Sequence, residues 1–247
     1  MSKLGELIEI PRKCEVGNTI FKKLFFENAK MNRTDKETFT KDIEKIKWDY
    51  NLKKDNINIK PYKDGIWDFP EVEFVTVKLK NSDKTNRIAE IIMRTIPYPM
   101  VLCFEKSNEI CIFTGDYKIN LADTSKNRID EFFFTDWIDL DNLDEDDIAL
   151  FDNLKLKNLN FTNFNAFYNC FIENIIRYNV FKTSHIRSNL DLWDIKDIYD
   201  KIIEIDTEIE VIKGQIKKET QFKYNVERNI KIKKLKDERE NLRGMLI

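Results

Sequence analysis

The ten residues EVEFVTVKLK, at positions 71–80, set the fold class of this chain. They are mostly β-branched, aromatic or aliphatic. In an extended chain, alternation would place Val75 and Val77 on one face and Phe74 and Thr76 on the other. We therefore predict a strand over these residues.

The segment that follows predicts a helix. Ile88 and Ile92 recur at helical spacing and would face inward. Ser82 or Asp83 is expected to cap the helix, and Pro97 to end it. Proline has no amide N–H to donate and restricts the residue before it.

Further extended runs lie downstream. Residues 100–105 and 109–114 flank a short polar connection, which is the pattern of a β-hairpin. Residues 130–137 hold three consecutive Phe and predict another strand, buried on at least one face.

Upstream of residue 71 the pattern indicates helices. Residues 18–28 would form a short helix with one apolar face. The motif TDKE at 34–37 matches a capping box, and the helix that it opens is expected to continue to Tyr50 with Ile43 on its buried stripe. Residues 56–59 predict a short extended segment.

The fold class predicted from these elements is α+β: a mostly antiparallel sheet with flanking helices, plus a C-terminal helical hairpin or coiled coil. We expect an α+β domain over residues 1–138, then an acidic linker and an aromatic-rich helix over residues 139–190. A basic coiled coil or helical hairpin would follow over residues 191–247.

The C-terminal segment has a heptad pattern that breaks after Ile216. A stutter in one long helix or a tight antiparallel hairpin near residues 218–221 would both explain the break, and we favour the hairpin. The apolar seam must be covered by its own second helix, by a twin subunit in a homo-oligomer, or by a larger protein partner. The seam residues are Ile198, Ile202, Ile205, Ile209, Ile212 and Ile216.

The same segment is locally basic. From Lys213 to Arg243 there are eleven Lys and Arg against five Asp and Glu, although the whole chain has a net charge of −2. Phosphate backbones bind such a surface through counterion release, while coiled-coil flanks are also Lys- and Glu-rich for solubility alone. The residues expected to contact nucleic acid are Lys217, Lys218, Lys223, Arg228, Lys231 and Lys234.

Composition excludes several other classes. No run approaches the roughly 18 apolar residues of a membrane span, and residues 1–10 lack the apolar region of a secretory signal. We therefore expect a cytoplasmic protein without membrane contact. No Gly-rich phosphate loop is present, and His185 is the single histidine, so neither a cofactor nor a histidine-based metal site is expected. The four cysteines lie far apart and are expected to be buried, reduced thiols.

A metal-dependent nuclease is the main enzymatic alternative. Asp68 and Glu73 would be the catalytic carboxylates, with Asp64 and Lys78 nearby. Glu73 and Lys78 are five residues apart and would point to opposite faces of a strand, so ordinary strand-edge charges are the simpler interpretation. The acidic run at residues 139–147 is interpreted as a solvated linker rather than a calcium loop, because it lacks the spacing of an EF-hand.

Ten short stretches of the chain point to one family. They are IPRKC (10–14), KK (22–23), FE (26–27), IKW (46–48), INI (57–59), IPYP (96–99), MVLCF (100–104), TDW (135–137), IKKETQF (216–222) and VERN (226–229). Together they resemble one bacterial family, the domain of unknown function numbered 4391, over nearly the whole chain. The resemblance implies an accessory subunit, because family members tend to be encoded beside Swi/Snf-type helicases and DNA methyltransferases in restriction-like or anti-phage islands. Thr220 and residues 223–225 depart from the more charged or polar pattern expected there.

From the sequence we predict a non-enzymatic accessory subunit of a bacterial DNA-targeting defence system. It would dock a helicase or a DNA methyltransferase, with nucleic-acid contact through the basic segment. The alternative is a metal-dependent nuclease subunit of such a system, and an inhibitor of a toxin is a third reading.

Overall fold

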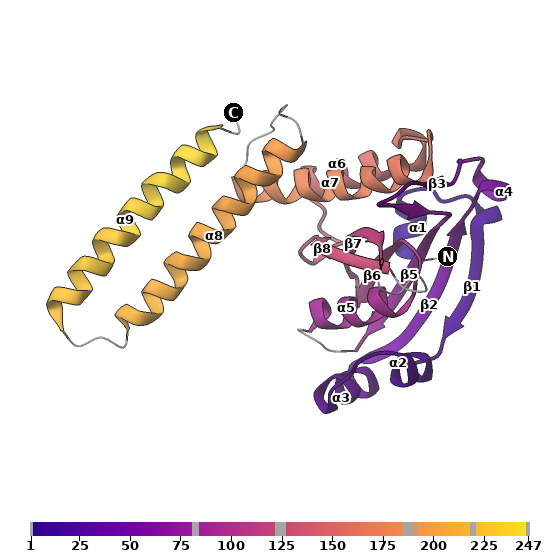
Figure 1. Cartoon of the computed structure of the whole chain (residues 1–247), viewed down its shortest axis with the longest axis horizontal. Coiled ribbons are helices and arrows are strands. Elements are labelled where there is room, and N and C mark those ends of the chain that lie inside the picture. Colours follow the sequence, from indigo (N-terminus) through magenta and orange to yellow (C-terminus); the bar gives the residue numbers. More distant parts are fainter. Residues whose placement is uncertain are drawn as a thin grey trace. The chain divides into compact units, whose positions relative to one another are not determined.

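The computed structural model describes residues 2–80, 84–121, 127–184, 190, 192–217 and 221–245. Within these residues, seven strands form one sheet in the order β1-β2-β5-β6-β7-β8, and β9 pairs with β7 (Figure 1). β5 and β6 run parallel, and the other neighbours are antiparallel. The strands are β1 (Glu15–Ile20), β2 (Ile43–Leu52), β5 (Val72–Leu79), β6 (Met100–Lys106), β7 (Glu109–Ile119), β8 (Asn127–Phe134) and β9 (Ile138–Asp139), with β3 (Tyr62–Lys63) and β4 (Asp68–Phe69) as a separate pair.

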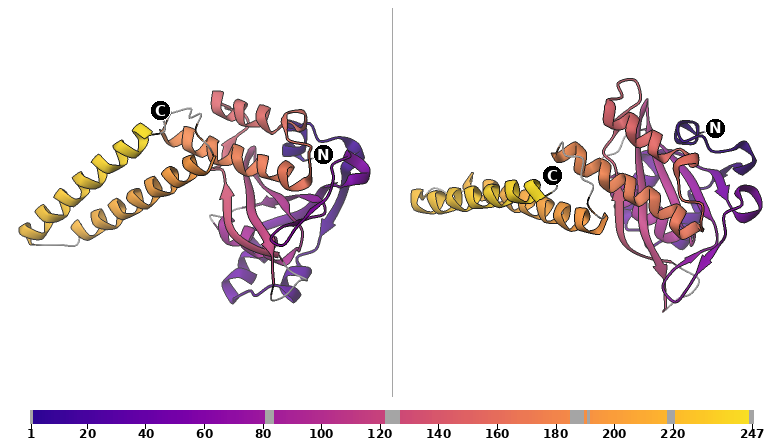
Figure 2. Two further views of the ribbon diagram at one scale, coloured as in Figure 1. Left: turned by 45° about the horizontal axis from the view of Figure 1, so that its top comes forward. Right: turned by 90° about the horizontal axis from the view of Figure 1, so that it is seen from above.

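Helices flank the sheet and complete the α+β fold that the sequence predicts. The first half of α7 (Phe164–Ser184) lies on one face of the sheet, where the rings of Phe171 and Phe74 pack with centroids 5.6 Å apart (Figure 2). α5 (Thr85–Thr95) connects the parallel strands β5 and β6. The other helices are α1 (Lys3–Leu7), α2 (Lys23–Asn28), α3 (Arg33–Lys41), α4 (Lys54–Ile57), α6 (Glu145–Leu154), α8 (Leu192–Ile216) and α9 (Phe222–Met245).

The central strand lies as expected. Every residue of β5 is buried except Lys78, because helices and neighbouring strands cover the alternating apolar side chains. The helix after it, the β6–β7 hairpin and the strand at the triple Phe are also confirmed. Ser82 and Asp83, the expected caps of α5, lie outside the described residues.

The helix expected to run from residue 34 to Tyr50 is wrong beyond residue 41. Residues 43–52 form β2, which pairs with both β1 and β5. The β2–β5 ladder shifts register between Ile43 and Lys45 and again between Trp48 and Tyr50. Such bulges break strict alternation. The buried apolar residues Ile43, Ile46 and Tyr50 are then spaced by three and four residues, which imitates a helix.

Several N-terminal elements differ from those expected from the sequence. Residues 18–28 are not one helix, since β1 ends at Ile20 and α2 begins at Lys23. The capping box of α3 starts at Asn32, whose Oδ1 accepts a hydrogen bond from the Asp35 N–H at 2.8 Å, rather than at Thr34. Residues 54–57 form α4 in place of the start of an extended segment.

The acidic run is partly built into a helix start. The Asp144 side chain accepts hydrogen bonds from the N–H groups of Asp146 and Asp147, both at 3.0 Å, and caps α6. Acidic side chains are favourable here because the exposed N–H groups give a helix N-terminus partial positive charge. Capping accounts for this part of the run.

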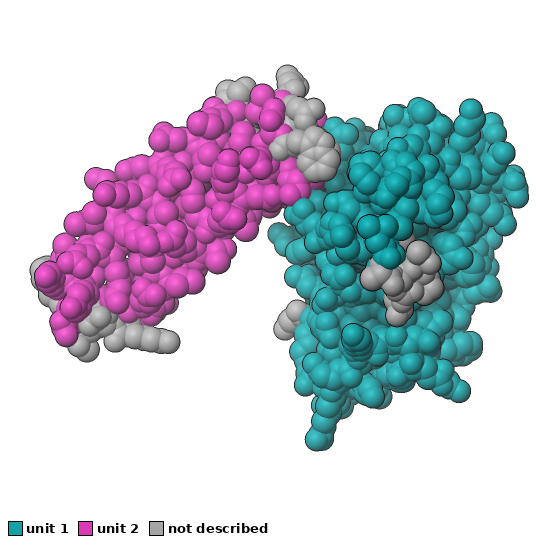
Figure 3. Space-filling model, viewed as in Figure 1, with its two compact units in different colours: residues 1–175 teal, residues 176–247 magenta. Residues whose placement is uncertain are grey.

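The chain divides into two compact units, residues 1–175 and 176–247 (Figure 3). The first contains the sheet, and the second contains α8 and α9. In the part of the chain that the structure describes, no helix is long and apolar enough to cross a membrane.

Candidate functional site

The predicted seam is filled from within the second unit. α8 and α9 form a hairpin, and Ile205, Ile209 and Ile212 of α8 pack in one buried cluster with Ile232 of α9. Leu235 and Leu242 of α9 and Ile216 of α8 cover this cluster. Ile202 is buried and Ile198 is half-buried. From Ile205 to Ile216 the heptad pattern therefore marks the inside of the hairpin, and the outer surface of the hairpin is what a partner can reach.

The two helices carry opposite charge. α8 has seven Asp and Glu against three Lys, while α9 has eight Lys and Arg against four Asp and Glu. Among the described residues, two ion pairs use this difference across the hairpin: Lys231 with Glu208 at 2.5 Å, and Arg239 with Asp206 at 2.8 Å. Part of the basic excess in the sequence thus serves the fold itself.

Several lysines of the hairpin remain available to a partner. Lys217, Lys223, Lys233, Lys234 and Lys236 are exposed, and within the described residues none has a carboxylate at ion-pair distance. Other cations of the hairpin do have such partners, as Lys213 does in Glu210 and Arg243 in Glu240. An exposed, unpaired lysine can be used by an anionic partner without breaking an existing ion pair.

The contact residues predicted from sequence therefore differ in their exposure and in their ion pairing. Lys217, Lys223 and Lys234 are exposed, Lys231 is engaged by Glu208, and Arg228 is half-buried. Lys218 lies outside the described residues. Sequence reasoning passed over two further lysines, although both belong to the same basic run. These are Lys233 and Lys236.

Apolar side chains accompany these lysines on the outer surface of α9. Val226 and Ile230 are four residues apart and are 39% and 54% exposed. Four residues bring two side chains to the same helix face. This face therefore combines an apolar pair with positive charge.

The carboxylates of the nuclease alternative are held by separate partners. Asp68 pairs with Lys63 across the β3–β4 ladder. Asp64 accepts hydrogen bonds from the N–H groups of Ile66 and Trp67, both at 2.7 Å, and these bonds lower its pKa. The described residues contain no group of three or more His, Cys, Asp or Glu placed to hold a metal ion.

Glu73 is buried on β5 and is bound by β2. Its Oε2 accepts a hydrogen bond from Trp48 Nε1 at 2.6 Å, and its Oε1 accepts one from Asn51 Nδ2 at 2.8 Å. Burial and the neighbouring Glu71 raise the pKa of Glu73 from 4.5 to about 7, against the opposing effect of the two hydrogen bonds. A carboxyl group that retains its proton up to about pH 7 is a weak metal ligand, because metal binding requires the ionised form.

Lys78 points away from Glu73, as the alternation of β5 predicts. Its Nζ lies 3.9 Å from Glu105 Oε2 on the neighbouring strand β6. Glu73 and Lys78 are thus not brought together.

The four cysteines add no reactive centre to the described residues. Cys14, Cys103 and Cys111 are buried thiols, and Cys170 is half-buried, with no disulfide among the four. Burial raises the pKa of Cys111 to about 12, so its thiol stays protonated and unreactive. His185 lies outside the described residues.

Residues 8–238 match one family model, described as a domain of unknown function, DUF4391. The chain belongs to the DUF4391 family. The matched region includes the sheet, α8 and most of α9, so the hairpin is part of the DUF4391 domain itself. No curated protein and no solved structure matches the chain.

Proposed function

We propose that this DUF4391 chain is a non-enzymatic, cytoplasmic accessory subunit of a bacterial DNA-targeting defence system of the restriction-like or anti-phage kind. The α8–α9 hairpin is its docking element, and the partner is a helicase or a DNA methyltransferase. The observation that carries this proposal is that the hairpin has its own core and presents on its surface five lysines that have no carboxylate partner among the described residues.

A hairpin with its own core can be presented to a partner without cost to the sheet domain. The cluster around Ile209 holds α8 and α9 together, so their outer faces are free of that task. In its contact role the α9 surface offers Val226 and Ile230 as the apolar centre, with Lys223 and Lys234 as the charged rim. Protein interfaces commonly combine an apolar centre with a polar rim.

The defence context comes from the family. The resemblance to DUF4391 implies gene neighbours that process DNA, and an accessory subunit must contact such neighbours to act. The same lysines would serve a DNA phosphate backbone in the assembled complex, since that contact needs only positive charge at the surface.

The proposal is tested by affinity capture from the native host, with mass spectrometry and with nuclease treatment to remove DNA-bridged proteins. The test variant carries Lys223→Glu, Lys233→Glu and Lys234→Glu. The matched control carries Lys54→Glu, Lys60→Glu and Lys157→Glu, which are exposed lysines of the first unit and change the net charge equally.

We expect the wild type and the control variant to recover a helicase or a methyltransferase, and the hairpin variant to lose it. Recovery of the same protein by the hairpin variant would overturn the docking role. Capture of no DNA-processing protein by the wild type would overturn the proposed system.

A further inference from the structure

A second basic surface lies in the first unit, at the end of the sheet next to α2 and α3. We call it the α2–α3 end and define it as residues 21–45, 78–80 and 84–90 (Figure 1, lower part). These residues include eleven Lys and Arg against six Asp and Glu, in a chain whose net charge is −2. The surface is distinct from the hairpin, and its role does not depend on that of the hairpin.

Two hydrogen bonds bring these segments together. Lys22 Nζ donates a hydrogen bond to the Ile43 carbonyl at 2.5 Å, and the Lys80 N–H donates one to the Asp42 carbonyl at 2.7 Å. These two bonds place Lys22 and Lys80 beside the adjacent residues Ile43 and Asp42. Burial and then the charge of Lys80 lower the pKa of Lys22. Two like charges are therefore held near each other at this end.

A second like-charge pair lies on the sheet. Lys45 of β2 is directly opposite Lys78 of β5, and both are exposed. Like charges directly opposite on antiparallel strands destabilise a sheet by a few tenths of a kcal/mol up to about 1 kcal/mol. The nearest carboxylate to Lys78 is that of Glu105, at 3.9 Å, and its other oxygen already accepts a hydrogen bond from the Lys3 N–H. An arrangement that opposes stability is the kind expected at a functional surface.

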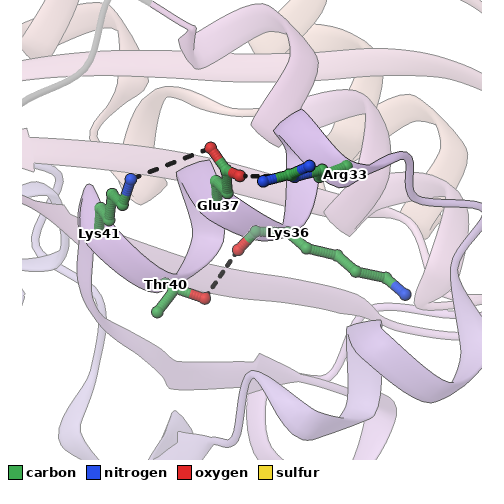
Figure 4. Close-up of a pocket in the computed structure, with 5 residues that line it drawn as sticks. All are labelled: Arg33, Lys36, Glu37, Thr40 and Lys41. Carbon is green, nitrogen blue, oxygen red and sulfur yellow. Dashed lines mark hydrogen bonds and ion pairs between the residues drawn. The ribbon is translucent and has the colours of Figure 1, made fainter.

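The outer face of α3 adds a further unneutralised cation. An open hollow of about 390 Å³ is lined by five residues of this helix (Figure 4). Glu37 is shared by Arg33 and Lys41, while the Lys36 side chain extends away from all three and has no carboxylate partner among the described residues. The lining residues are Arg33, Lys36, Glu37, Thr40 and Lys41.

We propose that the α2–α3 end binds the phosphate backbone of a double-stranded nucleic acid, with Lys22, Lys36, Lys45 and Lys80 as its contacts. Within the described residues none of these four amines has a carboxylate partner. Regularly spaced phosphates match several separate lysines better than a single small anion does. Release of condensed counterions supplies the free energy without any reading of bases.

The test measures binding of the full chain to a labelled duplex by fluorescence anisotropy over a series of salt concentrations. Duplex DNA and duplex RNA are the two nucleic-acid probes, and labelled polyglutamate represents an acidic protein. The test variant carries Lys36→Glu, Lys45→Glu and Lys80→Glu, and the control variant is again Lys54→Glu, Lys60→Glu and Lys157→Glu. In Figure 1, α6, which directly precedes Lys157, lies at the opposite end of the first unit from α2 and α3.

We expect the test variant to bind at least one duplex tenfold or more weakly than the wild type at low salt. The slope of log affinity against log salt should fall in magnitude by about 2 to 3, since each lost phosphate contact removes about 0.9 for B-form DNA. The control variant should keep the wild-type affinity and slope.

The single variant Lys45→Glu separates binding from folding. It should weaken duplex binding while leaving the thermal midpoint equal or higher, because the new carboxylate would face Lys78 as an opposite charge. Absence of duplex binding by the wild type, or equal loss in the control variant, would overturn the proposal. Preference for polyglutamate over both duplexes would overturn it as well, by assigning the surface to an acidic protein.

Discussion

Arg239 Nη1 on α9 donates a hydrogen bond of 2.8 Å to Asp206 Oδ1 on α8, across the hairpin. The bond and the Asp206 charge raise the pKa of Arg239, which therefore stays fully charged. Like the Lys231–Glu208 contact, this contact is an ion pair that joins an acidic helix to a basic one, and such pairs explain why the basic run in the sequence is only partly available to a partner.

The Arg239–Asp206 pair should contribute modestly to the stability of the hairpin, and this contribution should depend on the salt concentration. Both side chains are partly exposed, so solvent screening limits their coupling to about 0.5–1 kcal/mol. A double-mutant cycle of Arg239→Gln and Asp206→Asn, read from amide hydrogen exchange in α8 and α9, would measure it. The coupling should shrink in 1 M NaCl; a value indifferent to salt would show that the pair acts by packing instead.

The seam should dominate the stability of the hairpin. Ile209→Ala removes a side chain that is 3% exposed and should lower the free energy of opening of α8 and α9 by about 2–4 kcal/mol. Val211 is 56% exposed, so Val211→Ala is the matched control. This substitution should change the free energy of opening by less than about 0.5 kcal/mol. Amide hydrogen exchange measures the free energy of opening in both variants. Equal effects of the two variants would mean that the seam is not the core of the hairpin.

Glu73 should make the first unit less stable as the pH rises. Its pKa is about 7 in the folded chain against 4.5 ordinarily, so the folded state holds the proton more tightly. The free energy of unfolding should therefore fall between about pH 4.5 and 7, by an amount on the order of 3 kcal/mol. Glu73→Gln cannot ionise and should lose this part of the pH dependence.

Urea unfolding of wild type and Glu73→Gln at pH 5 and pH 8 checks the Glu73 prediction. The difference between the two proteins isolates this residue from the other carboxyl groups. If both proteins lost the same stability over this interval, the raised pKa of Glu73 would be contradicted.

Gly5 should tolerate no larger residue. A Cβ at this position would overlap the hydroxyl and ring of the buried Tyr50, so either this side chain or α1 must shift to admit a methyl group. Gly5→Ala should lower the free energy of unfolding by about 1–3 kcal/mol. Gly65 has open space around its Cα, and Gly65→Ala is the control. Unfolding of both variants at the wild-type temperature would contradict the close contact.

The elements that could be predicted from sequence are those whose signal is local. β5 is rich in β-branched and aromatic residues, and α5 ends where Pro97 requires it to end. β2 could not be predicted, since its two register shifts are visible only beside β5. The opposition of Lys45 and Lys78 has no local signal either, because 33 residues separate them in the chain.

In the candidate site too, features with a local sequence signal could be predicted, and features that depend on pairing between helices could not. Heptad spacing predicted which face of α8 is apolar, and α9 proved to cover much of it. The number of lysines after residue 213 can be read from the sequence. Which of them are neutralised depends on the pairing of α8 with α9, as the Lys231–Glu208 contact shows.

The docking role of the hairpin is tested most directly by chemical cross-linking of the captured complex in the native host. With an amine-reactive reagent, cross-links from Lys223, Lys233 or Lys234 to a helicase or a methyltransferase are predicted. Cross-links to that protein only from lysines of the first unit, such as Lys157, would contradict the account.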